Sequence, residues 1–434
     1  MLMPPNASAT PSSSVPGSSA TPLAGLNVLL IAMYYAPEST GSAPYTTDVA
    51  EHLAAMGADV KVITAPPHYP DWKRWTRYRN RWTTEVMNGV EVHRAPVYVP
   101  ADPTLSKRSM YELSFLSSAA LPAVSSRLDV VVGTSPSLFG GALARVISKV
   151  RRAPLVQLVQ DVVSAAPGQT GQSADDGLAA GTLAKIEGAA LRPAGAVTIP
   201  TDAFRPALCN LGVPANRIHT IPNWSRLTPR ETNRPSDRER LGWADRFVVL
   251  HTGNVGAKQA LHRLAPAIDY IGKQEPAVSF CFLGAGNQLG ALRKAMDGLP
   301  NVEIRNPVAD ADYFATLAAS DVLLVHEAPS VRNVSLPSKM TAYFAAGRPV
   351  LAVTQEEGAT AEELRRSRAG MIVPHDEGPL LHAGIQQLMG APETRTALGD
   401  NGQAYWQEHL APARGLTRVQ ELVGATAAGA PTLG

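Results

Sequence analysis

The sequence predicts an α/β protein of two facing domains, each a doubly wound parallel sheet, with the functional site in the cleft between them. Strand-like apolar runs alternate with helix-period stretches, which is typical of parallel sheets covered by helices. The alternation restarts after Asn223, and a length of 434 residues suits two ordinary domains rather than one. Because ligand sites favour domain interfaces, a shared cleft is preferred to two independent domains.

The first domain is expected over residues 26–222. Residues 1–25 are rich in Pro, Ser and Ala and carry no charged side chain, so we expect a disordered tail and no signal peptide. Buried strands are expected at the apolar runs 26–33, 59–64, 90–96, 129–135, 153–161 and 194–200. Helices are expected over 45–56, 137–150 and 178–191.

The second domain is expected over residues 223–410. Its strands are predicted at 245–253, 277–284, 301–305, 321–328 and 348–354. Its helices are predicted at 257–272, 288–296, 310–319, 338–346 and 359–366. Long helical stretches follow over 395–423, and we expect the helix within 411–434 to pack back on the first domain before a flexible end.

Composition excludes several classes of protein. The formal net charge is only +2 and no long run of Lys or Arg is present, so nucleic acid is not an expected partner. Cys209 and Cys281 lie in different halves, which argues against disulfides or a cysteine metal site and favours a reducing, cytoplasmic compartment. No apolar run reaches the ~18 residues of a membrane-spanning helix.

Three loops of the first domain carry candidate site residues. Gly41 and Ser42 lie just before a helix, where small residues let a phosphate or sugar approach the backbone, although a tight turn needs them too. His68 and Asp71 form a polar edge suited to sugar, or a proline-stiffened connection. Asp161 ends a buried strand, where it can orient a hydroxyl or cap the next segment.

Two segments of the second domain suit an anion. Gly253 and Asn254 form a loop, and Lys258 is expected at a helix start, where a cation is unfavourable unless an anion offsets it. A second helix start is expected over 335–339, where Lys339 adds charge to the free N–H groups behind Pro337. A capped core helix has the same pattern.

These motifs resemble retaining glycosyltransferases of family 4, which have the GT-B fold. The subgroup resembled is that of bacterial exopolysaccharide and O-antigen enzymes, typified by the colanic acid fucosyltransferase. The resemblance runs from about residue 26 to 390 through YYAPESTGSAPYT, DVKVITAPPHYPDW, QLVQD, IPNWS, HTGNVGAKQAL, FLGAGN and LPSKMTAYFAAGRPVLA.

The resemblance implies sugar transfer from a GDP- or UDP-sugar to a glycan or lipid-linked acceptor, with retained configuration and without a metal or other cofactor. Asp161 and Lys258 are the implied catalytic residues, and His68, Asp71 and Asp161 form the acceptor side. The implied donor side comprises Gly41, Ser42, Gly253, Asn254, Lys258, Glu327, Ser335, Leu336, Ser338 and Lys339.

The sequence departs from the family pattern at three positions. Val334 and Ala342 replace two family glutamates, and Asn254 replaces an arginine. Glu327 is the nearest upstream acidic residue that can substitute. Val334 and Ala342 therefore leave a catalytically degenerate partner protein as one alternative. A GT-B nucleotide-sugar epimerase is another, which needs a cluster of acid/base side chains in the cleft that the sequence does not show.

Residues 105–126 suggest contact with the membrane. Lys107 and Arg108 precede an apolar run, a pattern typical of a helix lying on the inner face of a membrane or packed on its own domain.

Overall fold

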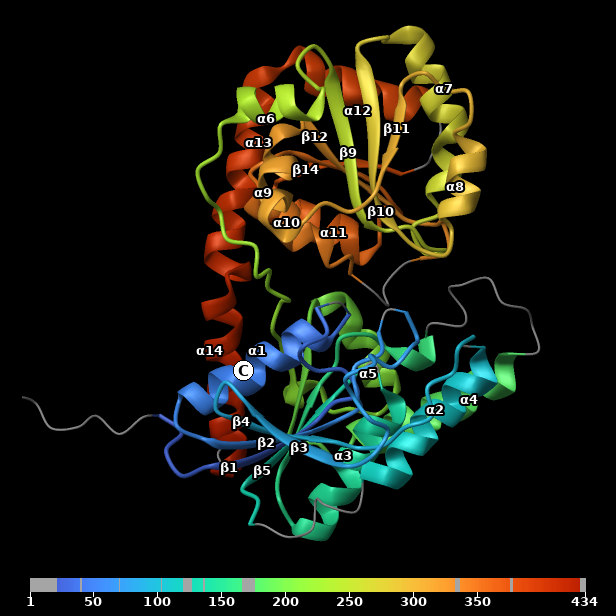
Figure 1. The fold of residues 1–434 in the computed structure, drawn as a ribbon. Helices are drawn as coiled ribbons and strands as arrows, with labels where there is room; N and C mark the ends of the chain where they lie inside the picture. Colours follow the sequence, from blue (N-terminus) through green and yellow to red (C-terminus); the bar gives the residue numbers. More distant parts are fainter. Residues whose placement is uncertain are drawn as a thin grey trace, which may run out of the picture.

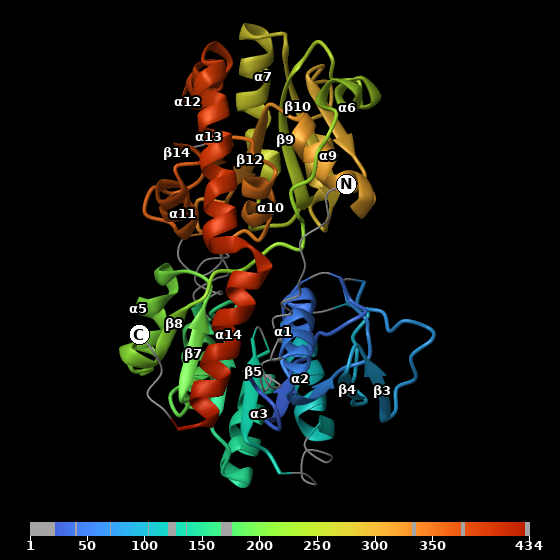
Figure 2. The same cartoon turned by 90° about the vertical axis from the view of Figure 1, so that its left-hand side faces the viewer.

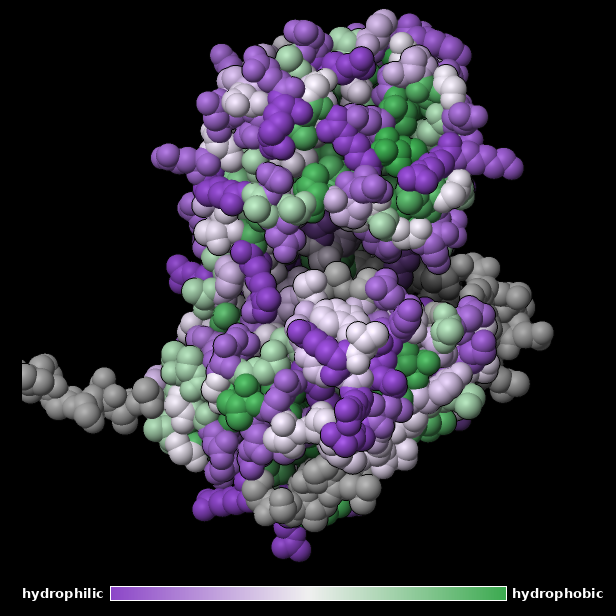
Figure 3. Space-filling view, in the orientation of Figure 1, coloured by the Kyte–Doolittle hydropathy of each residue, from purple (hydrophilic) through white to green (hydrophobic). Residues whose placement is uncertain are grey.

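The computed structural model describes residues 22–39, 41–69, 71–102, 104–119, 127–135, 137–165, 176–331, 336–374 and 378–429. It has two α/β domains, one above the other in Figure 1, each built around one sheet. In Figure 3 the surface between them is hollowed. The predicted fold class is therefore confirmed.

The N-terminal domain contains an eight-stranded sheet with the order β3-β4-β2-β1-β5-β6-β7-β8. All neighbouring pairs are parallel except β3 and β4, which form an antiparallel hairpin at one edge. The strands are β1 (Asn27–Ile31), β2 (Asp59–Thr64), β3 (Thr83–Met87), β4 (Val90–Arg94), β5 (Val130–Thr134), β6 (Leu155–Leu158), β7 (Ala196–Ile199) and β8 (Ile218–Thr220).

Helices cover both faces of this sheet, and one apolar cluster fills each side. The strands β5, β6 and β7 are buried at every position, which agrees with their largely apolar sequence. The helices are α1 (Ala43–Ala55), α2 (Leu105–Ala119), α3 (Leu138–Arg151), α4 (Asp176–Leu191) and α5 (Arg205–Asn210).

The C-terminal domain contains a six-stranded, wholly parallel sheet with the order β11-β10-β9-β12-β13-β14. Its strands are β9 (Phe247–Asn254), β10 (Val278–Ala285), β11 (Val302–Arg305), β12 (Val322–His326), β13 (Val350–Val353) and β14 (Gly370–Val373). Its helices are α6 (Arg234–Leu241), α7 (Ala265–Gln274), α8 (Leu289–Ala295), α9 (Asp310–Ala319), α10 (Lys339–Ala345), α11 (Ala359–Ser367), α12 (Gly378–Gly390) and α13 (Pro392–Tyr405).

The last helix, α14 (Pro412–Ala427), leaves the C-terminal domain and runs down the N-terminal one (Figure 2). A π-helical turn, Trp406–Leu410, joins it to α13. Val419, Leu422 and Val423 are buried in the same apolar cluster as residues of α1 and β1. The chain therefore crosses between the domains twice, once before α6 and once at α14.

The structure differs from the sequence expectations at several ends. Leu23, assigned to the tail, is buried, and its N–H donates to Met56 O at 3.0 Å. Three strands, β3, β8 and β14, were not predicted because β3 and β14 lack a buried apolar run and β8 has only three residues. No helix among the described residues is long and apolar enough to span a membrane.

Candidate active site

Each sheet reverses its strand order at one place. In the N-terminal sheet the reversal lies between β1 and β5, and in the C-terminal sheet between β9 and β12. Open α/β sheets bind ligands outside the carboxyl ends of the strands at such points. Most candidate residues of both domains follow the carboxyl ends of strands at or near these points, and Lys339 begins a helix.

Asp161 follows β6 at the carboxyl end of the N-terminal sheet. Ser135 Oγ donates to Asp161 O at 3.1 Å and accepts from Gln160 N at 3.1 Å, which fixes this backbone. Burial raises the pKa of Asp161, the Lys258 ammonium of the other domain opposes this rise, and Glu187 adds to it. Asp161 and Lys258 therefore lie close enough across the cleft to interact electrostatically.

Glu187 on α4 supports the segment after Asp161. Its two carboxylate oxygens accept from Val163 N and Ser164 N, each at 2.9 Å. These bonds hold the short helical turn Val163–Ala165. Glu187 is therefore a structural group, and Asp161 is the carboxylate that faces the opposite domain.

Gly41 and Ser42 lead into α1, as the sequence predicts. Gly41 has φ +66°, a left-handed conformation that favours glycine, and a Cβ atom there would lie 3.3 Å from the Tyr69 ring. Ser42 is the N-cap of α1, but its side chain makes no capping hydrogen bond. A second loop thus packs directly against this helix start.

The positions of His68 and Asp71 correct the predicted sugar edge. His68 is fully buried, and its ring nitrogens contact Pro66 O and Tyr111 Oη, each at 2.8 Å. It is therefore not available to a ligand, because both ring nitrogens are already engaged inside the domain. Asp71 is exposed in the turn that follows.

Glu38 is a buried carboxylate that the sequence reading missed. It is 4% exposed and accepts from His68 N at 2.6 Å and Tyr69 N at 2.7 Å. Burial raises the pKa of Glu38, and these two hydrogen bonds oppose the rise. Glu38 therefore joins the loop that leads to Gly41 to the loop that contains His68.

Lys258 lies in a turn rather than at a helix start. Ala260 adopts a left-handed conformation with φ +41°, and only a short helical turn, Leu261–Leu264, precedes α7. The expected helix over 257–272 is therefore wrong at its beginning, and the helix-dipole argument for Lys258 does not apply. The side chain depends on the turn itself for its position.

Several hydrogen bonds brace this turn against the sheet. Lys258 O accepts from Ala328 N at 2.8 Å, beyond the end of β12. Gln259 Oε1 accepts from Gly256 N at 3.2 Å and from Asn254 Nδ2 at 3.3 Å. Gly253 and Asn254 are the last residues of β9 rather than a loop. Lys258 thus projects from a well-supported backbone.

Lys339 lies over the end of β9 at the start of α10. Its Nζ is 2.9 Å from His251 Nε2, and a Cβ on Gly253 would lie 3.8 Å from its Cε. His251 Nδ1 is 3.1 Å from Leu324 O, which only accepts, so Nδ1 carries the proton and Nε2 accepts from Lys339. His251 was not predicted; its place near the end of a buried strand is the signal for it.

Burial lowers the pKa of Lys339 to about 7, and Glu327 opposes this effect. Glu327 is 8% exposed and accepts from Thr354 Oγ1 at 2.6 Å. Burial raises the pKa of Glu327, while Thr354 and the two lysines, Lys339 and Lys258, lower it. The end of β12 thus places one carboxylate within electrostatic range of both candidate phosphate-binding cations.

The remaining donor-side candidates surround the start of α10. Leu336 is half-buried against the apolar core, and Ser338 is exposed and caps the helix without a side-chain hydrogen bond. Ser335 and Val334 lie outside the described residues. Ala342, at the position of a family glutamate, is buried in the apolar core.

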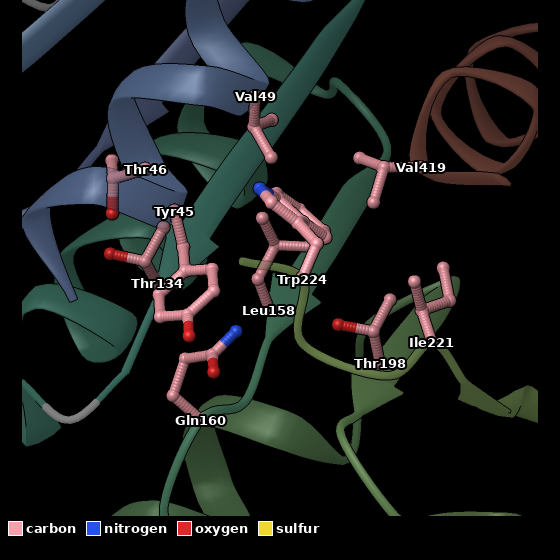
Figure 4. A pocket seen from close by; sticks show the side chains of 10 residues that line it. All are labelled: Tyr45, Thr46, Val49, Thr134, Leu158, Gln160, Thr198, Ile221, Trp224 and Val419. Carbon is pink, nitrogen blue, oxygen red and sulfur yellow. The ribbon is translucent and has the colours of Figure 1, made fainter. Parts of the chain in front are cut away.

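The linker between the domains, residues 221–233, joins β8 to α6. A small cavity lies beside this linker (Figure 4). Thr134, Gln160 and Thr198 contribute polar groups from the carboxyl side of the N-terminal sheet. Its other walls come from α1, the end of β6, the linker and α14, through Tyr45, Thr46, Val49, Leu158, Ile221, Trp224 and Val419. It is separate from the Lys258 and Lys339 cluster.

Comparisons with known proteins identify the family of the chain. Residues 40–224 match the family model of the glycosyl transferase 4-like domain, and residues 246–390 match that of glycosyl transferases group 1. The chain is 30% identical over 388 residues to WcaI of Escherichia coli strain K12, named as a colanic acid biosynthesis glycosyl transferase; the match covers 86% of this chain and 94% of WcaI.

Solved structures share the fold at low identity. Sucrose-phosphate synthase from Thermosynechococcus elongatus has a TM-score of 0.73 at 16% identity, covering 93% of this chain and all of that one. HepE from Anabaena, in complex with UDP, has a TM-score of 0.65 at 16% identity, covering 91% of this chain and 98% of HepE. The chain therefore belongs to the glycosyltransferases of the group 1 and 4-like type, with the GT-B fold.

Proposed function

We propose that the protein transfers a sugar from a nucleotide diphosphate sugar to a glycan or lipid-linked saccharide, with retention of anomeric configuration, during exopolysaccharide or surface polysaccharide synthesis. The observation that carries this proposal is the pair of cations at the β9/β12 switch point, Lys258 and Lys339, both within electrostatic range of Glu327, with Lys258 also interacting with Asp161 of the other domain. WcaI, by its name, supports the polysaccharide pathway. HepE structures with UDP and UDP-glucose support a nucleotide-sugar donor.

The donor binds on the C-terminal side of the cleft in this proposal. Lys258 and Lys339 neutralise the diphosphate, and charge stabilisation of the leaving group is the main catalytic contribution. With two lysines in that role, we propose no metal and no other cofactor. The donor site is lined by Gly253, Asn254, Leu336 and Ser338, and the sequence resemblance adds Ser335. Glu327 favours the charged form of Lys339.

The acceptor binds on the N-terminal side. Gly41 and Ser42 lie beside the transferring sugar, and Asp161 orients the acceptor hydroxyl. The leaving phosphate accepts the hydroxyl proton as the nucleophile attacks from the same face, which retains the configuration. Asp71 is the exposed member of the acceptor side, while His68 acts only by holding Tyr111. The free cysteines Cys209 and Cys281 fit a reaction on the cytoplasmic side.

A panel of GDP- and UDP-sugars tests the function. One nucleotide class should raise the melting temperature, since a ligand at 100 times its Kd stabilises the native state by about 2.7 kcal/mol. Incubation of that donor with saccharide acceptors, followed by mass spectrometry, should then show transferred sugar. An epimerised donor would instead identify the protein as an epimerase. If no nucleotide sugar of the panel binds or reacts, the protein is a degenerate partner.

A further inference from the structure

The amino ends of the C-terminal strands hold a group of arginines. Arg234 and Arg238 lie on α6, Arg348 lies in the loop between α10 and β13, and Arg395 lies on α13. We call these four arginines and Asp321, the residue before β12, the arginine group. α6 lies in the half of the domain that is away from the cleft (Figure 1). β9 spans eight residues, so its amino end and its carboxyl end at the cleft are roughly 25 Å apart.

Asp321 is the carboxylate that two of these arginines share. Arg234 Nη2 donates to Asp321 Oδ1 at 2.6 Å, and Arg238 Nη1 donates to Asp321 Oδ2 at 3.0 Å. Val248 N also donates to Asp321 Oδ2, at 2.8 Å. Asp321 is buried, and both of its oxygens are therefore engaged by groups other than Arg348.

The register of the sheet brings Arg348 to the same place. Leu323 of β12 pairs with Val350 of β13. Two residues earlier on each chain segment, Asp321 and Arg348 therefore lie opposite each other. Arg348 thus joins a group whose carboxylate is already shared.

The Arg348 guanidinium has no partner of its own. Among the residues that the structure describes, it forms no hydrogen bond or ion pair, and its Nε is buried. Arg234 Nε is likewise buried without a hydrogen-bond partner. Burial lowers the pKa of Arg348 to about 10, and the charge of Arg234 lowers it more strongly than Asp321 opposes the effect. Two N–H donors of interacting arginines thus lack acceptors, which is destabilising in a buried position.

The positive charge of the arginine group exceeds its negative charge. Four guanidinium groups and one carboxylate give it a net charge of +3. Arg395 Nη1 donates to Leu388 O at 2.6 Å and to Met389 O at 3.2 Å, contacts that hold its guanidinium without neutralising it. The Arg234 side chain is 33% exposed, and Arg348 and Arg395 are half-buried. A small anion can therefore reach this charge from solvent.

We propose that the arginine group binds a phosphate oxyanion, either inorganic phosphate or the phosphate of a small monoester. A guanidinium presents its N–H donors as a planar fork that matches two phosphate oxygens, and the unsatisfied donors of Arg234 and Arg348 gain acceptors in this way. The half-buried position of these arginines favours a small anion over an acidic macromolecule. This site lies at the opposite end of the sheet from the proposed donor site and goes beyond the proposed function.

Calorimetric titration of the full chain with inorganic phosphate, in a buffer without other oxyanions, tests the proposal. Because the two lysines of the cleft also attract phosphate, the titration is made in the variant Lys258→Ala/Lys339→Met. We expect this variant to bind one phosphate. Loss of phosphate binding in it would place the anion in the cleft and overturn the proposal.

Substitutions within the arginine group locate the site. Added to the cleft variant, Arg348→Gln should weaken phosphate binding about tenfold or more, because a hydrogen bond between charged groups is lost. Arg234→Gln should weaken it as well and provides the test if Arg348→Gln does not fold. Arg293→Gln removes the same charge from an exposed position on α8 and should leave the affinity unchanged. Equal affinities in all of these variants would overturn the site.

Thermal unfolding separates anion binding from a structural role of Arg348. Phosphate should raise the melting temperature of the cleft variant, since a ligand that binds the native state stabilises it, and should have no such effect once Arg348→Gln is added. Glucose 6-phosphate that binds at least as tightly as inorganic phosphate would identify a monoester as the ligand, and binding of inorganic phosphate alone would identify the free ion. Tighter binding of a hexaglutamate peptide would overturn the proposal in favour of an acidic protein partner. Neither measurement involves sugar transfer, so the result is independent of the proposed function.

Discussion

At the scale of single residues, charge is concentrated where the two domains face each other. Lys258 comes from the turn after β9, Lys339 comes from the start of α10 in the same domain, and Asp161 comes from the other domain. Lys258 interacts electrostatically with Asp161, and both lysines interact with Glu327. Removing one of them therefore disturbs a shared field rather than an isolated contact.

Substitution of Lys258 and of Asp161 tests their separate roles. We expect Lys258→Ala to lower kcat by about 100-fold or more, because a charge stabilising the leaving group is lost. Asp161→Ala should cost ~100-fold through misplacement of the acceptor. Steady-state transfer assays measure both. Near-normal transfer in both variants would remove this assignment, and Lys294→Ala, an exposed lysine on α8, serves as the control.

Lys339 should make donor binding depend on pH. Its pKa of about 7 lies below its ordinary value of 10.5, so the free lysine loses its charge as pH rises above neutrality. A donor diphosphate favours the charged form, and binding should therefore weaken from pH 6 to pH 9 with uptake of a proton. Calorimetry of a nucleotide sugar in buffers of different ionisation enthalpy measures this uptake. Lys339→Met should bind weakly and without this pH dependence.

The same pKa has the opposite consequence for stability. Below about pH 7 the lysine is protonated in both folded and unfolded chains, so its contribution is constant. Between about 7 and 10.5 the unfolded chain binds more protons, and the contribution of Lys339 to the free energy of unfolding rises with pH. Affinity and stability should thus change in opposite directions, which a general loss of structure at high pH does not produce.

At the scale of elements, α14 depends on a close approach to the linker. A Cβ atom on Gly415 would lie 2.4 Å from the Trp224 ring. Helical glycine normally costs about 0.5–1 kcal/mol relative to alanine, so Gly181→Ala in α4, where nothing lies within 4 Å, should stabilise the protein. Gly415→Ala should instead destabilise it by ~1–3 kcal/mol through overpacking. Urea unfolding measures both free energies of unfolding, and a change of the same sign in the two variants would contradict this packing.

At the scale of the whole molecule, one carboxylate ties the linker to the first domain. Asp48 on α1 accepts from Trp224 Nε1 and from Arg226 Nε, each at 2.8 Å. Trp224 is buried, whereas the Arg226 side chain is half-exposed, so most of the effect belongs to the tryptophan. The hydrogen bonds of Asp48 with Trp224 and Arg226 and the packing of α14 together determine how the two domains face each other.

Asp48→Ala should loosen this arrangement. We expect a loss of about 1–3 kcal/mol, typical of hydrogen bonds to a charged group, and a broader distribution of distances between the domains. Denaturant unfolding and small-angle X-ray scattering measure the two effects. Glu51→Ala on the same helix removes an exposed hydrogen bond from Asn88 and an electrostatic interaction with Arg226 that is weaker than that of Asp48, so it should leave the scattering unchanged.

The sequence by itself determined the two α/β domains and most of their elements. Runs such as residues 129–135 are legible because period and burial are local properties of the chain. It also indicated Asp161, Lys258 and Lys339, since strand ends and helix starts are recognisable in order along the chain.

Which of these side chains are engaged inside their own domain depends on the tertiary structure. His68 has an apt position in the sequence, yet Tyr111 and Pro66 occupy its ring, whereas the unremarked His251 holds Lys339. Lys258 lies in a turn rather than at the expected helix start because Ala260 adopts a left-handed conformation. The contacts of His68 with Tyr111 and of Lys339 with His251 join residues far apart in the chain, and no local sequence pattern encodes such contacts.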